Sequence, residues 1–249
     1  MHVETKLPEA EFYIFLPLLV HELAARGKPY DQTFYDMEDR DLAEARRIFR
    51  ARLARRMDLD ARFRPAGAPV DHFDDPNLPM TADLFPAYSA FAKPKPQALP
   101  HYGRPDERKY LWPSRPIVSP EWKAAIEALE PGVHEFFAHG LRFKDATVDD
   151  HFVFRGRQGV EFLDFDACAD VVITREWDGA LIPRLAPEGV RPRRVVGRRE
   201  PLRGRHWVES VGQSFVSPAL AERLAPLLPP SAEFAPIELV DPTSSRRAS

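Results

Sequence analysis

The chain has 249 residues, 44% of them hydrophobic, and a formal net charge of −3. This length and apolar content are enough for a folded core. A nearly neutral chain has no overall positive field to attract nucleic acid or an anionic membrane. The single cysteine, Cys168, excludes an intramolecular disulfide and a cysteine-rich zinc site. We therefore expect a cytoplasmic globular protein.

The first hundred residues contain an apolar run, a helix and a proline-rich connector. The run 12–20 is shorter than the roughly 20 residues of a membrane span, so it predicts a buried strand or helix start. The periodicity of residues 39–57 predicts a helix that buries Leu42, Ala45, Phe49 and Leu53. Its arginines predict a solvated face. Prolines in residues 64–115 exclude long helices and central strands, and the aromatic residues there predict packing against the body.

The second half predicts short strands and a basic loop. Strands are expected at residues 151–154, 159–165 and 170–174, with a hairpin at residues 155–158. The arginine-rich residues 191–205 predict an exposed loop, and residues 244–249 predict a frayed tail.

One segment of the chain occurs twice. A shift of 98 residues aligns residues 117–141 with residues 215–239 without a gap. The identical pairs are Val118/Val216, Ser119/Ser217, Pro120/Pro218, Leu129/Leu227, Pro131/Pro229, Glu135/Glu233, Phe136/Phe234 and Leu141/Leu239. Each copy predicts a serine N-cap, a proline at the first helical position, a proline stop and then a strand. Pro236 predicts a strand at the edge of a sheet.

Several blocks resemble the immunity-protein-eleven-like family of bacterial polymorphic toxin systems. They are residues 115–122 (RPIVSPEW), 129–137 (LEPGVHEFF), 162–168 (FLDFDAC), 215–220 (FVSPAL) and 232–237 (AEFAPI). The likeness covers about residues 112–239, with residues 175–204 richer in proline and arginine than the family pattern. The resemblance implies a cytoplasmic antidote that binds one cognate toxin, with no catalytic residues and no cofactor.

We predict an α+β protein with one mixed or antiparallel sheet flanked by helices, built as one compact body. Residues 1–105 would form a helical region and the connector, residues 106–243 the immunity-like domain, and residues 244–249 the tail. The sequence does not indicate the oligomeric state.

The residues predicted to bind a basic toxin are two acidic clusters, because opposite charge speeds and orients association. They are Asp71, Asp74 and Asp75, and Asp145, Asp149 and Asp150.

Two alternatives remain open. A hydrolase or metal-dependent enzyme could use His72, Asp74, Asp149 or His151, although their spacing fits no common metal site. An RNA-associated protein could use residues 191–205 and the arginine face of the first helix, although stacking aromatics are missing from the loop. Cys168 follows two aspartates that would raise its thiol pKa, which predicts a buried residue and not a nucleophile.

Overall fold

The computed structural model divides into two compact units, where we expected one body. The N/C unit comprises Met1–Tyr30, Ala128–Glu130 and Gln158–Ser249, and the central unit comprises Asp31–Glu127 and Pro131–Arg157. The structure describes residues 7–17, 42–63, 76–91, 93–103, 115–175, 181–185, 192–210, 212–229 and 232–241. The tail 244–249 lies outside these residues, and the predicted three-part division stays a prediction.

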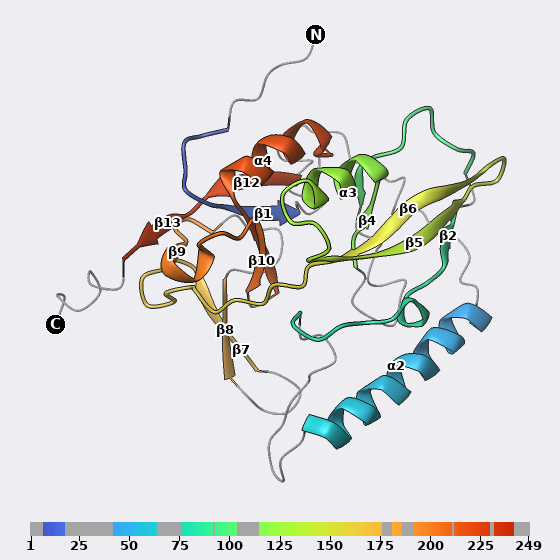
Figure 1. Ribbon diagram of the computed structural model, residues 1–249, viewed down its shortest axis with the longest axis horizontal. Helices are drawn as coiled ribbons and strands as arrows, with labels where there is room; N and C mark the ends of the chain where they lie inside the picture. The colour runs from blue at the N-terminus through green and yellow to red at the C-terminus, as the bar shows by residue number, and fades with distance from the viewer. Residues whose placement is uncertain are drawn as a thin grey trace. The chain divides into compact units, whose positions relative to one another are not determined.

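The central unit is built on a five-stranded mixed sheet (Figure 1). Its strand order is β3 (Tyr102–Gly103), β4 (Ile117–Val118), β6 (Thr147–Arg155), β5 (Glu135–Arg142) and β2 (Tyr88–Ala90). Only the β2–β5 pairing is parallel. The helices described in this unit are α2 (Leu42–Phe63) and α3 (Pro120–Glu127), with a 3₁₀ turn η2 (Ala82–Leu84).

The N/C unit has its own four-stranded antiparallel sheet (Figure 1). Its order is β10 (Trp207–Ser210), β11 (Gln213–Val216), β1 (Tyr13–Pro17) and β12 (Ala232–Pro236). The helix α4 (Pro218–Leu224) follows β11 and continues into η5 (Ala225–Leu227). Two small sheets pair β7 (Val171–Arg175) with β8 (Leu181–Leu185), and β9 (Val196–Arg198) with β13 (Glu238–Val240); η4 spans Glu200–Leu202.

The α+β class is therefore confirmed, but the single sheet is wrong, because each copy of the repeat belongs to a separate sheet. The edge position predicted from Pro236 is confirmed, since β12 ends the order of its sheet. The apolar run 12–20 supplies β1, and Phe12 to Leu16 are all buried.

Equivalent residues of the two copies pair with equivalent partners in their respective sheets. Val118 pairs with Phe152 in the central unit, and its counterpart Val216 pairs with Tyr13. Phe136 pairs with Phe154, and its counterpart Phe234 pairs with Phe15. The N-terminal strand β1 is thus equivalent to β6. In the central unit the shared elements follow one another along the chain as β3, β4, α3, β5 and β6. In the N/C unit β1, the equivalent of β6, comes first, and β10, β11, α4 and β12 follow. The second order is therefore a circular permutation of the first.

The aromatic packing on the two sheets repeats as well. The ring centroids of Phe136 and Phe154 lie 5.1 Å apart, and those of Phe234 and Phe15 lie 5.6 Å apart. The Phe136–Phe152 distance of 6.3 Å corresponds to 6.4 Å between Phe234 and Tyr13. Because the same contacts form twice, the repeat in the sequence is a repeat of structure.

The predicted helix starts are confirmed in both copies. The Oγ of Ser217 accepts the N–H of Leu220 at 3.3 Å, and the Oγ of Ser119 accepts that of Trp122 at the same distance. Each of these helices also buries one apolar stripe, since Trp122, Ile126, Leu220 and Leu224 are fully buried.

The predicted buried face of α2 is wrong. Phe49 and Leu53 are 41% and 46% exposed, whereas Ile48 and Arg52 are buried. Arg52 donates from Nε to the carbonyl of Leu84 at 2.8 Å. Arg47 donates to the carbonyls of Asp83 and Phe85, and Arg55 donates to the carbonyl of Pro79. The irregular connector leaves these carbonyls without sheet or helix partners, so guanidinium groups on α2 satisfy them.

Two predicted features of the second half are also wrong. Residues 159–165 form only single bridges at Gly159 and Leu163, so they are not a strand and residues 155–158 are not a hairpin turn. The bridge between Leu163 and Gly197 depends on the glycine at position 197. A Cβ atom there would lie 2.5 Å from the ring of Phe162, which is fully buried in the core of the N/C unit.

Candidate functional site

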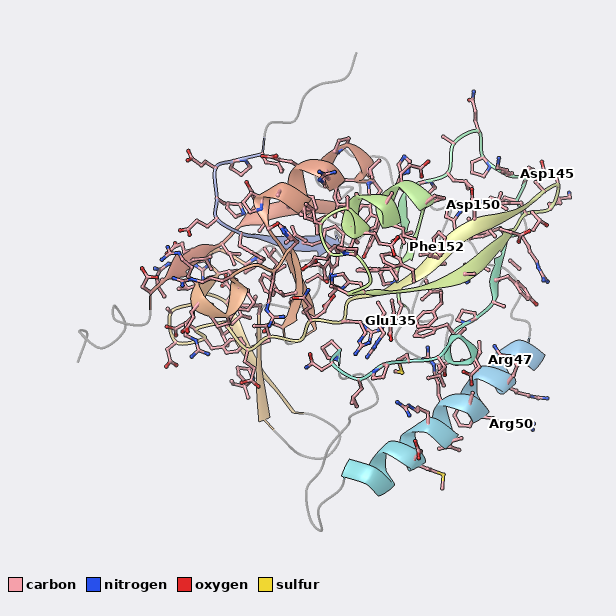
Figure 2. The ribbon with its side chains drawn as sticks, viewed as in Figure 1. Arg47, Arg50, Glu135, Asp145, Asp150 and Phe152 are labelled. Carbon is pink, nitrogen blue, oxygen red and sulfur yellow. The ribbon has the colours of Figure 1, made fainter. Side chains whose placement is uncertain are left out.

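The predicted acidic residues are the first candidate site. Asp145, Asp149 and Asp150 are all exposed in the central unit, and Figure 2 shows Asp145 at the tip of the β5–β6 ribbon. Asp71, Asp74 and Asp75 lie outside the described residues, so their predicted role in toxin binding stays a prediction.

A β-bulge presents the two aspartates of β6. His139 pairs with His151 and Leu141 pairs with Val148, so Gly140 alone faces Asp149 and Asp150. A Cβ atom at Gly140 would lie 2.9 Å from Oδ1 of Asp149 and 3.4 Å from Cβ of Tyr88. A regular strand would turn successive side chains to opposite faces. The bulge instead leaves both carboxylates exposed.

Asp145 lies in a mixed electrostatic environment. Its Oδ1 accepts the backbone N–H of Lys95 at 2.7 Å, and the neighbouring N–H of Lys144 donates to the carbonyl of Lys93. All three lysines are exposed. Their charges oppose that of Asp145, so the negative surface centres on Asp149 and Asp150.

The histidines beside the bulge are buried. His139 makes contacts of 2.9 Å to the carbonyl of Pro86 and 2.8 Å to the hydroxyl of Ser89. Burial lowers the pKa of His139 to about 4, so the imidazole is neutral at pH 7. His151 contacts Asp150 at 2.7 Å through Nδ1. Both rings are fixed in the sheet by these contacts.

Only two of the four residues of the alternative metal or hydrolase site, His151 and Asp149, lie among the described residues, so this alternative stays a prediction. His151 is buried whereas Asp149 is exposed, and His72 and Asp74 lie outside the described residues. Within the described part of the chain, no group of three or more His, Cys, Asp or Glu side chains is placed to hold a metal ion.

Two serine–histidine pairs were not anticipated from the sequence. His206 Nδ1 lies 2.7 Å from Ser217 Oγ, and His101 Nδ1 lies 2.9 Å from Ser119 Oγ. In a catalytic triad the acid and the serine contact opposite nitrogens of the ring. Glu121 contacts the same Nδ1 of His101, at 3.4 Å, so the geometry is not that of a triad. The serines cap helices, and the histidines hold them there.

A buried carboxylate, Glu130, and a partly buried one, Glu135, also escaped the sequence prediction. Glu130 accepts the backbone N–H groups of His206 at 2.8 Å and Trp207 at 2.9 Å, which positions the start of β10. Glu135 accepts a 2.8 Å bond from the buried Arg155, whose guanidinium also donates to the carbonyl of Leu78. Both residues lie in the first copy of the repeat, residues 117–141, and this is their only signal in the sequence.

Three arginines of residues 191–205 form ion pairs within the N/C unit. Arg193 pairs with Asp170 and Arg194 with Glu238, at 2.7 and 2.8 Å. Arg199 pairs with both Glu11 and Asp241. These residues also include β9 and η4, so the prediction of a plain loop is wrong. Phosphate binding through Arg193, Arg194 or Arg199 would require an ion pair to break, and the RNA alternative stays a prediction.

The pKa values of the paired acids follow from the same contacts. The hydrogen bond from Arg193 lowers the pKa of Asp170, and that from Arg194 lowers the pKa of Glu238. The Arg199 side chain likewise lowers the pKa of Glu11. All three carboxylates are held in the charged form.

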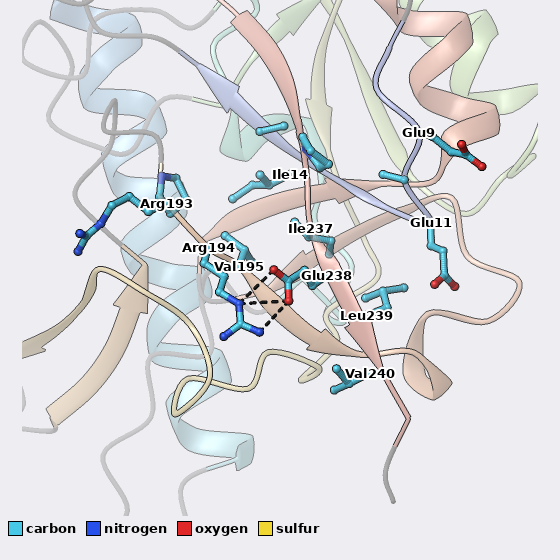
Figure 3. A pocket seen from close by; sticks show the side chains of 14 residues that line it. Glu9, Glu11, Ile14, Arg193, Arg194, Val195, Ile237, Glu238, Leu239 and Val240 are labelled. Carbon is cyan, nitrogen blue, oxygen red and sulfur yellow. Dashed lines mark hydrogen bonds and ion pairs between the residues drawn. The ribbon is translucent and has the colours of Figure 1, made fainter. Parts of the chain in front are cut away.

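A groove of about 760 Å³ lies beside β13 in the N/C unit (Figure 3). Its floor includes core side chains such as Ile14, Val195 and Ile237. Its rim carries Arg194 and Glu238, which bond to each other across it. A charged ligand would compete with this internal pair, so the groove offers no ready anion or cation site.

Cys168 lies against the core of the N/C unit. Its Sγ accepts the N–H of Val196 at 3.2 Å, and burial raises the pKa of its thiol. Asp164 raises the pKa further. The predicted direction is confirmed, but burial and not the neighbouring aspartates is the main cause.

No described helix is long and apolar enough to cross a membrane. Comparison with protein-family models and with curated proteins gave no match to this chain.

Proposed function

We propose that this protein neutralises a cognate bacterial toxin by binding to it and blocking its active surface. The observation that carries the proposal is the exposed acidic pair Asp149–Asp150, held by a bulge in a long antiparallel ribbon. The sequence blocks that resemble the immunity family support the choice of partner. They include both helix starts, the first residues of β5 and all of β12.

The ribbon fixes the acidic residues before binding. The pairing of β5 and β6 runs from Glu135–Arg155 to Arg142–Thr147, and Phe143 closes the turn by donating to the carbonyl of Ala146 at 2.7 Å. Side chains on a rigid strand lose little conformational entropy when a partner binds. Such a surface suits tight association without chemistry.

Charge complementarity sets the class of toxin surface. Two adjacent carboxylates favour a basic patch, such as one that a nuclease would present to nucleic acid. Occupying that patch would exclude the toxin's substrate. The pair would contribute mainly to the association rate, because exposed charges steer encounters more than they strengthen the final complex.

The test begins with the toxin-domain protein encoded beside this chain. Co-expression should restore growth, and the purified proteins should form a complex. Asp149→Lys with Asp150→Lys should slow association about tenfold at low salt and weaken its salt dependence. Asp166→Lys, at an exposed aspartate of the N/C unit, is the matched control and should leave the rate unchanged.

Two results would contradict the proposal at different levels. Absence of both rescue and complex formation would reject toxin neutralisation. A complex whose association rate is the same in the Asp149→Lys/Asp150→Lys variant would reject this contact surface.

A further inference from the structure

The structural repeat includes a further strand in each unit. β2 pairs parallel with β5, and β9 pairs parallel with β13. The N–H of Gly140 donates to the carbonyl of Ala87 at 2.8 Å. The N–H of Glu238, the counterpart of Gly140 in the second copy, donates to the carbonyl of Val195 at 2.9 Å. Because the same backbone contact forms in both units, β2 is equivalent to β9.

The next contact along these strands identifies the equivalent of Arg199. The N–H of Phe91 donates to the carbonyl of Arg142 at 2.8 Å, and the N–H of Arg199 donates to that of Val240 at 3.1 Å. Positions 142 and 240 are related by the same shift of 98 residues as the two copies of the repeat. Phe91 therefore occupies in the central unit the place that Arg199 occupies in the N/C unit.

The acidic residues Asp150 (Figure 2) and Glu11 are equivalent as well. They lie two residues before Phe152 and Tyr13, which pair with equivalent strands. Their side chains are 64% and 57% exposed. Glu11 forms a bidentate pair with Arg199, whose Nε and Nη2 each donate to a different carboxylate oxygen at 2.7 Å.

The second aspartate of the pair has a comparable counterpart in Glu238. A Cβ atom at Gly140, the equivalent of Glu238, would lie 2.9 Å from Oδ1 of Asp149, so this carboxylate occupies the space of the missing side chain. In the N/C unit Glu238 accepts three hydrogen bonds of 2.8 to 3.1 Å from Arg194 (Figure 3). The residue equivalent to Arg194 is Pro86, which has no side-chain donor.

The central unit thus has the two carboxylates without their arginines. Phe91 is buried instead, with its ring centroid 4.8 Å from that of Phe143. Within the described part of the chain, no arginine or lysine side chain pairs with Asp149 or Asp150. His151 contacts only Oδ1 of Asp150. Each carboxylate oxygen can accept two hydrogen bonds, so both oxygens can still accept from a guanidinium group.

We propose that the toxin supplies the guanidinium group that Arg199 supplies in the N/C unit, so that a toxin arginine forms a bidentate pair with Asp150 beside Asp149. This inference rests on the proposed function and names the side chain that the site recognises. Arginine suits the site better than lysine, because its planar donor fork matches both oxygens of a carboxylate, whereas an ammonium group is a point charge.

Peptides test the chemistry of the site without the toxin. Hexa-arginine and hexalysine carry the same charge, so a difference between them reports the guanidinium group. They are titrated into the ¹⁵N-labelled full chain, and the backbone amide signals of positions 149 and 150 are followed. The dissociation constant for hexa-arginine should be lower than that for hexalysine by about fivefold.

Asparagine variants are the controls for the peptide titration. Asp149→Asn with Asp150→Asn should remove the difference between the two peptides, because the amide groups are neutral. Asp166→Asn, at an exposed aspartate of the N/C unit, should retain it. Equal dissociation constants in the unaltered chain, or a preference that the double variant keeps, would overturn the guanidinium site.

Variants of Asp150 test the contact in the complex with the toxin-domain protein encoded beside this chain. The dissociation rate is the readout, because steering by charge acts on association and does not depend on the kind of cation. Asp150→Asn should speed dissociation about fivefold. Asp150→Glu should leave it nearly unchanged, because a glutamate makes the bidentate pair at the equivalent position 11.

Exchange of each exposed arginine of the toxin for lysine identifies the occupant. One such exchange should speed dissociation about fivefold, and it should add nothing further when it is combined with Asp150→Asn. Circular dichroism should be the same for all variants of this chain, since the carboxylates are exposed.

The outcomes separate this inference from the proposed function. Absence of both rescue and a complex with the unaltered proteins would reject toxin neutralisation and, with it, the toxin as the source of the guanidinium group. A complex that dissociates at the same rate in Asp150→Asn, or that no arginine-to-lysine exchange in the toxin affects, would overturn this inference and leave neutralisation intact.

Discussion

Nδ1 of His206 lies 2.7 Å from Oγ of Ser217, and the same contact occurs in the other unit between His101 and Ser119 at 2.9 Å. In each case the serine backbone N–H also donates to the histidine carbonyl, at 2.9 Å. The pair joins the first strand of the motif to the start of its helix. Because the pair recurs in both units, we infer that it holds the start of the helix against the strand and that the serine is not a nucleophile.

Ser217→Ala should lower the free energy of unfolding by about 1–2 kcal/mol, because α4 loses its N-cap and His206 loses a partner. Urea denaturation followed by circular dichroism measures the change. Thr81→Ala is the matched control, since Thr81 precedes η2 without a side-chain cap bond. An equal loss in both variants would show that the serine–histidine pair contributes nothing.

Arg155→Met should destabilise the protein by about 3 kcal/mol, because it leaves Glu135 in a largely buried site with only weaker partners. Combining it with Glu135→Met should cost less than the sum of the two single variants. Equilibrium denaturation of all four proteins gives this coupling.

The control for this pair is Arg193→Met. Arg193 makes an exposed ion pair with Asp170, its side chain being 82% exposed, so the change should be under about 1 kcal/mol. Strict additivity of Arg155→Met and Glu135→Met would contradict the assigned role of the buried pair.

The buried His139 predicts acid sensitivity. Its pKa falls from 6.5 to about 4 on folding, with burial as the main cause. Its contribution to stability is complete above pH 6.5. As the pH falls toward 4, the unfolded chain binds a proton that the folded chain excludes, and up to about 3 kcal/mol is lost. His139→Gln should remove this part of the pH dependence in thermal unfolding.

Ser89→Ala separates titration from hydrogen bonding. It removes the hydroxyl at Nε2 of His139 but keeps the imidazole. Stability should then fall at every pH while the slope between pH 6.5 and 4 remains. A wild-type slope in His139→Gln would assign the acid sensitivity to other groups.

Cys168 should react slowly with thiol reagents in the folded state. Burial raises the pKa of its thiol, so little thiolate is present near neutral pH. Reaction with a chromogenic disulfide at about pH 8 should be at least tenfold slower than in denaturing urea. Equal rates would show that the N/C unit does not protect the sulfur.

Part of the fold could be predicted from local chemistry. Ser119 and Ser217 begin helices because a hydroxyl followed by proline satisfies a helix start with no distant partner. Pro236 marks an edge because proline cannot donate to a neighbouring strand. These features depend on neighbouring residues alone, and the structure confirms them.

The strands that precede each copy of the repeat could not be matched from the sequence, because the loops that follow them differ in length. Tyr102 and Trp207 occupy equivalent places beside Val118 and Val216, but the two connections differ in length, so an ungapped shift misses them. The central strand is harder still to find, because Tyr13–Phe15 comes first in the N/C unit, whereas Phe152–Phe154 comes near the end of the central unit. A search for the alternating aromatic pattern, free of chain order, could have found it.

The candidate site depended on tertiary structure in the same way. The sequence placed Asp149 and Asp150 beside each other, but only the bulge opposite Gly140 decided that both are exposed. The sequence also predicted that Phe49 and Leu53 of α2 are buried, and this prediction is wrong. The backbone carbonyls of the connector turned Arg52 inward and Leu53 outward.

By itself, the sequence determined the helix starts, the edge strand and the existence of a doubled motif, because each depends on residues close together in the chain. Tertiary structure alone decided that the motif forms two sheets, that β1 completes one of them, and which charges are paired. Strand order, burial and ion pairing join distant residues, and their energies depend on which groups meet when the chain folds.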